Sequence, residues 1–301
     1  MAAFPIVNVH GGAALLPRLA AAGVPGDRME WCDPVAFGPT PQGLSDDDWY
    51  RLRAAYLASG LNAPAGRQDI AKGLRAQDEA LRAIPTASEV VLWVGPELFC
   101  QAILIRLLVL LGDRPRVSLV DPGDNPVSPG CGLDARTPAQ LQDLFARRRP
   151  VTAGDVAFAR QAWAAFTAAT AQPLVALLRT DAPLPHASAA LTRHLGDLPD
   201  GASGLSTSET RILEELRRGP AQLGPLLRAV AAREPRPFLG DTALDEILGR
   251  LADGPAPLVT RDSAGLASIT RRGGDVLHGF EVWFARRWHG GIEVTPDEDP
   301  D

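Results

Sequence analysis

The stretch that decides the fold is Glu89–Val94 (EVVLWV), which is followed by Leu98–Leu111 (LFCQAILIRLLVLL) and Val117–Val120 (VSLV). The first run is continuous and rich in β-branched residues, which is typical of a strand buried on both faces. The second is almost entirely apolar and long enough for a helix that is covered on most sides. Strand, helix and strand in this order predict a parallel sheet with helices on its faces.

The same alternation extends in both directions along the chain. Short strands are expected at Phe4–Val9 and Arg28–Cys32, with a helix between them. Thr137-Pro138 is an N-cap residue followed by proline at the first helical position, so another helix is expected to begin there. We therefore predict an α/β fold, with a Rossmann-like, mostly parallel sheet domain over residues 1–150.

The second half of the chain lacks this alternation. A helical connector is expected over residues 151–200. Ser206-Thr207-Ser208-Glu209 is a capping box that begins the first of three helices, and two short strands follow them. Three helices and a two-stranded wing are typical of a winged helix-turn-helix. We therefore predict a winged-helix-like domain over residues 201–282 and a C-terminal tail over residues 283–301.

Composition excludes several classes of protein. Of 301 residues, 46% are hydrophobic and 22% are charged, which excludes a disordered or fibrous chain. Acidic residues outnumber basic ones by 36 to 30, and the formal net charge of −6 argues against a protein that coats nucleic acid. Lys72 is the only lysine, so arginine supplies nearly all of the basic side chains.

Cysteine use and the apolar stretches indicate the compartment. The three cysteines are widely spaced and form no CxxC pair, which argues against a disulfide framework or a structural zinc site. The first residues show no basic region followed by an apolar core, so no signal peptide is expected. Leu98–Leu111 is too short to span a bilayer and contains Arg106. We therefore expect a cytoplasmic protein without a membrane partner.

Ligands of doubly wound sheets bind beyond the carboxyl ends of the strands. Four loops leave the expected strands at that edge: residues 10–12, 33–39, 95–97 and 121–125. Two glycines in the first loop let a ligand approach the backbone, and the following helix start offers N–H groups to an anion. No GxGxxG or P-loop motif is present, so a tight strand-to-helix turn is the simpler alternative.

Seven residues in or near these loops are candidates for a site. His10 is the candidate general acid or base, because its ordinary pKa lies near neutrality, and Asp33 and Glu97 are the catalytic carboxylate candidates. The candidate ligand-binding residues are Gly11, Gly12, Arg53 and Asp121. The simpler alternatives are turn capping before proline for Asp33 and Asp121, and a solvated ion pair for Arg53.

Other motifs exclude further kinds of site. No histidine has HxxxH or HExxH spacing, so no metal site is predicted, and the GxSxG nucleophile elbow of serine hydrolases is absent. The sequence leaves the identity of any cofactor unknown. The third helix of the winged-helix-like domain carries Asp241, Asp245, Glu246 and Asp253 against Arg250 alone. An acidic recognition helix repels phosphate, so DNA is not the expected partner.

Several short segments follow one another in a distinctive order. They are Asn8-Val9-His10-Gly11-Gly12, Trp31-Cys32-Asp33, Gly38-Pro39, Arg53-Ala54-Ala55-Tyr56-Leu57, Val91-Leu92-Trp93, Gln101, Ala162-Trp163-Ala164-Ala165-Phe166, Gly204-Leu205-Ser206 with Glu209, Phe238-Leu239-Gly240-Asp241, Arg287-Trp288 and Gly290-Gly291. In this order the chain resembles the bacterial domain-of-unknown-function 1835 family over nearly its full length. The resemblance implies the α/β fold above, and the family has no established activity to carry over.

Three departures from the family pattern concern polar residues. Gly11-Gly12 stands where the family usually has Gly-Asp, and Ala36-Phe37 stands where it usually has a His-Glu pair. Gly95-Pro96-Glu97 stands where it tends to have an acidic-His-Asp run. These replacements imply either a changed chemistry or a scaffold that serves another task.

Two functions of different classes remain open. The first is binding of a small anionic or nucleotide-like ligand at the carboxyl edge of the sheet, with His10 and a carboxylate as the pair that would make the protein an enzyme. The second is a non-catalytic regulatory or interaction protein whose winged helix contacts a protein partner or DNA.

Overall fold

Five strands form the central sheet of the computed structural model, which describes residues 4–12, 14–59, 66–120, 133–235 and 238–295. The strands are β1 (Ile6–His10), β2 (Asp27–Glu30), β3 (Glu89–Trp93), β4 (Val117–Val120) and β5 (Arg149–Pro150), in the order β2-β1-β3-β4-β5. The first four are parallel, and β5 is antiparallel to β4. The predicted α/β class with a mostly parallel sheet is therefore confirmed.

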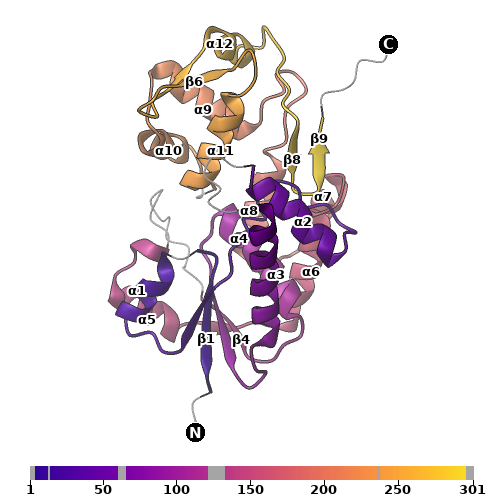
Figure 1. Cartoon of the computed structure of the whole chain (residues 1–301), viewed down its shortest axis with the longest axis vertical. Helices are drawn as coiled ribbons and strands as arrows, with labels where there is room; N and C mark the ends of the chain where they lie inside the picture. Colours follow the sequence, from indigo (N-terminus) through magenta and orange to yellow (C-terminus); the bar gives the residue numbers. More distant parts are fainter. Residues whose placement is uncertain (1–3, 13, 60–65, 121–132, 236–237, 296–301) are drawn as a thin grey trace.

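Helices cover both faces of this sheet (Figure 1). One face carries α1 (Leu15–Ala21), the short 3-10 turn η1 (Leu133–Ala135) and α5 (Pro138–Ala146). The other carries α2 (Asp46–Leu57), α3 (Arg67–Ala83), α4 (Leu98–Leu111), α6 (Ala153–Phe166), α7 (Gln172–Leu177) and α8 (Pro185–Leu195). Along β3, Val91 and Trp93 pack toward α1 and α5, whereas Val90 and Leu92 pack toward the other helices. Burial on both faces explains why the sequence of β3 is apolar without a break.

Side-chain caps fix where several of these helices begin. Ser45 caps α2, and Thr137, as the sequence predicts, and Thr152 form capping boxes at the starts of α5 and α6. The helix α4 differs, because the Glu97 side chain in front of it makes no capping hydrogen bond. The first turn of α4 therefore lacks the side-chain acceptor that the other three helices have.

The helices of the expected connector are part of the sheet domain's core. Phe158 and Ala162 of α6 and Leu191 of α8 are buried in the same apolar cluster as α4. The sheet and its helices, residues 4–195, are called the sheet domain below.

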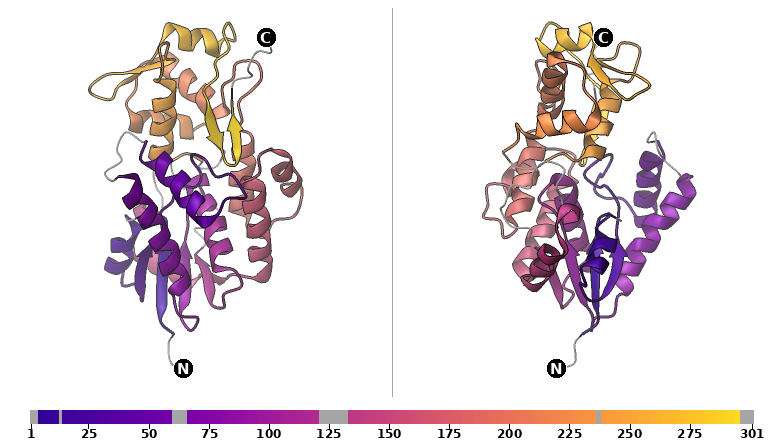
Figure 2. Two further views of the ribbon diagram at one scale, coloured as in Figure 1. Left: turned by 45° about the vertical axis from the view of Figure 1, so that its right-hand side comes forward. Right: turned by 90° about the vertical axis from the view of Figure 1, so that its left-hand side faces the viewer.

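A second, smaller core lies in residues 205–277, which we call the C-terminal unit. It contains α9 (Thr207–Arg218), α10 (Leu223–Ala231), α11 (Asp241–Leu251), β6 (Val259–Arg261), β7 (Ala267–Ile269) and α12 (Arg271–Leu277). The Ser206 capping box at the start of α9 is present as predicted, and β6 and β7 pair antiparallel. Both views of Figure 2 show this unit at the end of the molecule opposite the N-terminus, where the parallel strands have their carboxyl ends.

The chain then returns to the sheet domain as a hairpin of β8 (Arg287–His289) and β9 (Ile292–Val294), which we call the tail hairpin. Gly290 at its turn has a positive φ of 62°, and its carbonyl accepts a hydrogen bond from the Thr40 N–H. The Gly291 N–H donates to the Phe166 carbonyl at the end of α6. The hairpin turn is therefore held against the sheet domain by main-chain hydrogen bonds.

Replacing Gly291 by alanine should detach the tail hairpin from the sheet domain. A Cβ at this position would overlap the Thr167 carbonyl and lie 2.7 Å from the Ala168 carbonyl oxygen. Overpacking of this kind costs about 1–3 kcal/mol, which is as much as two main-chain hydrogen bonds contribute. Faster amide hydrogen exchange over residues 287–294 is the expected result. Gly249→Ala is the control, because a Cβ there meets open space, and its exchange should match that of the unmodified protein.

No helix among the described residues is long and apolar enough to cross a membrane.

Candidate functional site

The carboxyl ends of β1 and β3 lie together at the point where the strand order reverses. β2 lies on one side of β1 and β3 on the other, so the chain crosses over between them. The register places His10 opposite Trp93. A crevice outside such a pair of strand ends is the usual ligand site of a doubly wound sheet. The loops 10–12 and 95–97 follow these strands and therefore share one edge, as the sequence predicts.

The His10 ring spans these two strands. Its Nδ1 lies 2.6 Å from the Trp93 carbonyl oxygen, and because a carbonyl only accepts, Nδ1–H is the donor. This bond fixes the ring orientation at the sheet edge and, in the neutral ring, places the lone pair on Nε2.

The two glycines after His10 have different surroundings. A Cβ on Gly11 would lie 2.6 Å from the Ile103 Cδ1 atom, so Gly11 permits α4 to pack closely on the end of β1. A Cβ on Gly12 would meet no atom of the described residues within 4 Å. Gly11 therefore has a packing role, whereas no described residue fills the space beside Gly12.

A buried amide lies at the start of α4. Gln101 is 3% exposed, and its Nε2 donates to the Gly95 carbonyl in the loop after β3. Its Oε1 has no hydrogen-bond partner among the described residues. The Glu97 carboxylate lies over Gly95 in the same loop, where a Cβ would collide with it. The loop thus combines a carboxylate, an uncapped helix start and an unsatisfied amide oxygen.

Arg53 and Asp33 form a buried ion pair. Arg53 is fully buried and Asp33 is 2% exposed, and the guanidinium donates to both carboxylate oxygens at 2.6–3.2 Å. The same guanidinium also donates to the carbonyls of Pro34, Phe37 and Pro39. It therefore holds the whole loop after β2 in one conformation.

This arrangement corrects the expectation of a solvated ion pair for Arg53, because the pair lies in the interior. It also leaves the Arg53 side chain engaged with the protein rather than exposed to an anionic ligand. Asp33 is the partner of Arg53, and Asp121 lies outside the described residues.

A small cavity of about 60 Å³ lies between the sheet edge and the C-terminal unit. A polar space of this size has room for a few water molecules. The sheet domain contributes Ala36, Phe37, Gly38, Leu98 and His194. The rest of the lining is Asp197, Ser206, Phe238, Leu239, Ala243, Glu246, Ile247, Arg250, Arg287, Trp288 and His289. The C-terminal unit and the tail hairpin therefore cover the carboxyl edge of the sheet.

Two arginines beside this cavity share one buried carboxylate. Glu209 is fully buried, and it accepts hydrogen bonds from Arg250 at 3.0 Å and from Arg287 at 3.3 Å. The second bond ties the tail hairpin to α9, because Arg287 is the first residue of β8. Burial lowers the pKa of Arg287, and the Glu209 carboxylate opposes that effect.

Two stacked histidines join the tail hairpin to α8. The rings of His194 and His289 are 3.6 Å apart between centroids and nearly parallel. The His289 Nε2–H donates to the His194 carbonyl. Burial lowers the pKa of His194 well below its ordinary value and that of His289 to about 4. Both rings are therefore neutral at neutral pH.

The helix α11 of the C-terminal unit faces Tyr56, which is a residue of the sheet domain. This tyrosine lies on α2, and the Glu246 carboxylate of α11 lies near enough to affect its pKa. Burial, and then the neighbouring carboxylate, raise the pKa of the phenol. The Tyr56 ring also packs on Gly38, where a Cβ would touch the ring at 2.5 Å. The third helix of the C-terminal unit is thus turned inward at this position.

Sequence reasoning missed the cavity because its lining is spread from Ala36 to His289. One signal for it was present. Gly38, Phe238-Leu239 and Arg287-Trp288, which belong to the ordered segments noted in the sequence, border this one space.

Metal and thiol chemistry have little support here. Within the part of the chain that the structure describes, no group of three or more His, Cys, Asp or Glu side chains could hold a metal ion. Burial and the charges of Glu30 and Asp33 raise the pKa of the Cys32 thiol to about 11, so the reactive thiolate is disfavoured at neutral pH.

A scan of the chain against models of known protein families gives no match, and a search of curated proteins gives no match either.

Proposed function

We propose that this protein binds a small anionic, nucleotide-like ligand at the carboxyl edge of its sheet, between Gly12 and the start of α4. The observation that carries the proposal is the Gln101 amide. The Gln101 side chain is anchored by its hydrogen bond to the Gly95 carbonyl. Its buried Oε1 lacks a donor among the described residues. An unsatisfied buried acceptor costs about 1–3 kcal/mol, and a ligand hydroxyl or amino group would supply the missing hydrogen bond.

The start of α4 supplies the complementary preference for negative charge. This helix has 14 residues, and its first N–H groups and its dipole favour an anion. The space beside Gly12 lets such a group approach the backbone. A nucleotide or a phosphorylated sugar carries both an anionic group and hydroxyl donors, so it matches both features.

The same edge carries the proposed acid–base pair. His10 is held in place by the Trp93 carbonyl, and Glu97 lies on the adjacent loop. We assign proton transfer to His10, with Glu97 as the accompanying carboxylate. Asp33 receives no such role, because Arg53 binds its carboxylate.

A thermal-shift screen with nucleotides, acyl-CoA, S-adenosylmethionine and phosphorylated sugars tests the proposal. A ligand at 100 times its dissociation constant should stabilise the protein by about 2.7 kcal/mol. Gly12→Ala should leave the melting temperature without ligand unchanged, because its Cβ meets no neighbour, and should abolish the ligand shift. Gly73→Ala on α3, which also has open space around it, is the matched control and should keep the shift.

His10→Ala separates binding from catalysis. The variant should still give the thermal shift with the ligand that the screen finds, and should lose turnover of that ligand. A ligand whose shift survives Gly12→Ala unchanged would place the site elsewhere and contradict the proposal.

We also propose membership of the domain-of-unknown-function 1835 family. The support is spatial: three segments that carry the resemblance, at Gly38, at Phe238-Leu239 and at Arg287-Trp288, are far apart in sequence and border one cavity.

The second candidate function treats the C-terminal unit as a winged helix that contacts a partner. One observation favours a protein partner: Phe280, Val282 and Phe284 are exposed by 79%, 52% and 41% along one segment. DNA is disfavoured, because α11 carries acidic side chains and uses Glu246 and Arg250 inside the molecule. A salt-sensitive mobility shift with duplex DNA would reverse that preference.

A further inference from the structure

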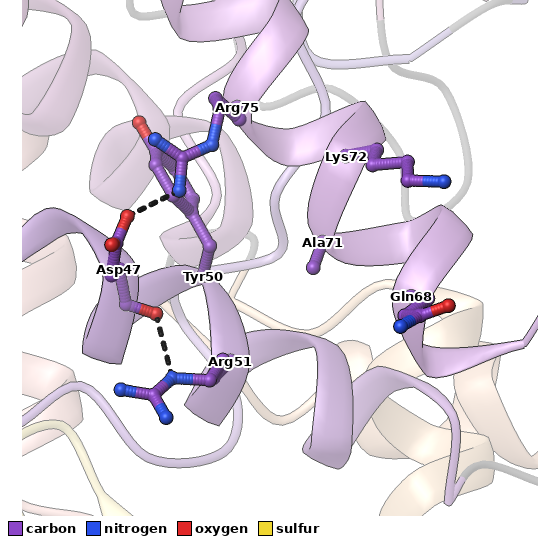
Figure 3. A pocket seen from close by; sticks show the side chains of 7 residues that line it. All are labelled: Asp47, Tyr50, Arg51, Gln68, Ala71, Lys72 and Arg75. Carbon is purple, nitrogen blue, oxygen red and sulfur yellow. Dashed lines mark hydrogen bonds and ion pairs between the residues drawn. The ribbon is translucent and has the colours of Figure 1, made fainter.

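The helices α2 and α3 lie side by side and leave a groove of about 530 Å³ between them (Figure 3). This volume is in the range of small-molecule sites. Its polar lining consists of Asp47, Tyr50 and Arg51 from α2, with Gln68, Lys72 and Arg75 from α3. It shares no lining residue with the cavity at the sheet edge, so it is a separate feature.

Helical spacing brings these polar groups together. Gln68, Lys72 and Arg75 occupy positions i, i+4 and i+7 of α3, and positions with this spacing lie on one face of a helix. Asp47 and Arg51 are four residues apart on α2 and lie across the groove from them.

The described lining of the groove holds more basic than acidic side chains, and each of its cations pairs with an aspartate: Arg51 with Asp48, Lys72 with Asp69 and Arg75 with Asp47. Its lining has three cations and one carboxylate, in a chain whose formal net charge is −6. Lys72 is the only lysine, and its Nζ lies 4.0 Å from an Asp69 oxygen, with both side chains more than 70% exposed. A pair this exposed contributes little, so the ammonium can readily turn to another anion.

One of the three cations is held in place before any ligand binds. Arg75 pairs with Asp47, and its guanidinium lies 4.9 Å from the centroid of the Tyr50 ring. The hydrogen bond from Arg75 holds the pKa of Asp47 below its ordinary value, so this pair stays charged at neutral pH. A fixed guanidinium loses less conformational entropy when it binds an anion.

We propose that this groove binds a compact polyphosphate, that is, a di- or triphosphate group. Arginine and lysine side chains are the preferred donors to phosphate oxygens, and three of them surround one small space. Among the described residues, Ala71 completes the lining and the Tyr50 ring is buried under Arg75, so none of them offers an open aromatic face for a nucleobase to stack on. The negative charge of a ligand, rather than an aromatic ring on it, therefore determines whether the ligand binds in this groove.

Calorimetric titration of the full chain with inorganic triphosphate tests the proposal. Arg51→Ala and Lys72→Ala should each weaken binding by about tenfold, because each removes a charge-assisted hydrogen bond. A rise from about 50 to about 300 mM salt should weaken it further by screening. Arg147→Ala is the matched control, because Arg147 is an exposed arginine paired with an aspartate on its own helix, as Arg51 is. Its affinity should equal that of the unmodified protein.

The single lysine gives an independent measurement. An amine-acylating reagent can modify Lys72 and the N-terminal amine only, so peptide mass spectrometry reports the groove directly. Inorganic triphosphate should slow acylation of Lys72 several-fold. ATP should protect equally well and adenosine not at all, since the phosphates make the contacts.

Equal affinity of Lys72→Ala and the unmodified protein for triphosphate would overturn the proposal. So would unchanged acylation of Lys72 at a saturating concentration of triphosphate. Loss of triphosphate binding in Gly12→Ala would move the site to the sheet edge and also overturn it. Because Gly12 lies outside this groove, the two binding proposals can fail separately.

Discussion

Arg53→Ala should lower the free energy of unfolding of the sheet domain by about 3–5 kcal/mol, measured by urea denaturation. This is the usual cost of removing one member of a buried ion pair, because the other charge remains in the interior without a partner. Here Asp33 would be left at 2% exposure, and three carbonyls of the loop after β2 would lose their donor.

A double substitution separates the ion pair from simple packing. Arg53→Met with Asp33→Asn removes both charges and keeps most of the volume, so it should be clearly more stable than Arg53→Ala alone. The exposed pair of Arg147 and Asp143 serves as the control, and Arg147→Ala should change stability by less than about 1 kcal/mol. A cost below about 1 kcal/mol for Arg53→Ala would contradict the structural role given to this residue.

The second large effect is a loss of stability in mild acid that depends on His289. The pKa of this residue is about 4 in the folded protein, and the ordinary value of 6.5 applies to the unfolded chain. Between these values the unfolded chain binds a proton that the folded chain does not, so stability falls as the pH falls. The stability that depends on the neutral His289 ring is fully present above pH 6.5 and is lost by about pH 4. A difference of this size corresponds to about 3 kcal/mol.

His289→Gln should flatten the pH dependence of the unfolding free energy between pH 7 and pH 4.5. The glutamine amide does not titrate and can still donate a hydrogen bond to the His194 carbonyl. His194 shifts in the same direction, so part of the slope should remain in this variant. His278→Gln replaces an exposed histidine and is the control. The stacked pair would be irrelevant to acid stability if both variants kept the slope of the unmodified protein.

The fold could be predicted wherever one local signal was sufficient. The run at Glu89–Val94 forms β3, and the apolar stretch Leu98–Leu111 forms α4 with the same bounds. Capping residues such as Ser206 marked helix starts correctly. Each of these signals lies within a few residues of sequence, where burial or capping acts directly.

The elements that sequence missed depend on distant partners. β5 has only Arg149 and Pro150, and it exists because it pairs with β4 at the sheet edge. The tail hairpin has no strong strand pattern and is ordered against Thr40 and Phe166. Such contacts are set by the whole fold, so no local pattern could have predicted them.

The candidate site, like the fold, could be predicted only in part. The glycines after β1 and the loop after β3 were predicted to share an edge, because parallel strands end on one side. The roles within that edge were not predictable: Asp33 and Arg53 are 20 residues apart, and their burial depends on the packing of α2. No site role could be predicted for Gln101, because the missing partner of its Oε1 is visible only in three dimensions.

The docking of the tail hairpin also has a consequence for how the protein is made. Residues 287–294 are synthesised after the parts of the sheet domain that they contact. The newly made sheet domain therefore exists for a time with the surface around Thr40 and Phe166 uncovered. That surface can be covered only after the tail hairpin has been synthesised.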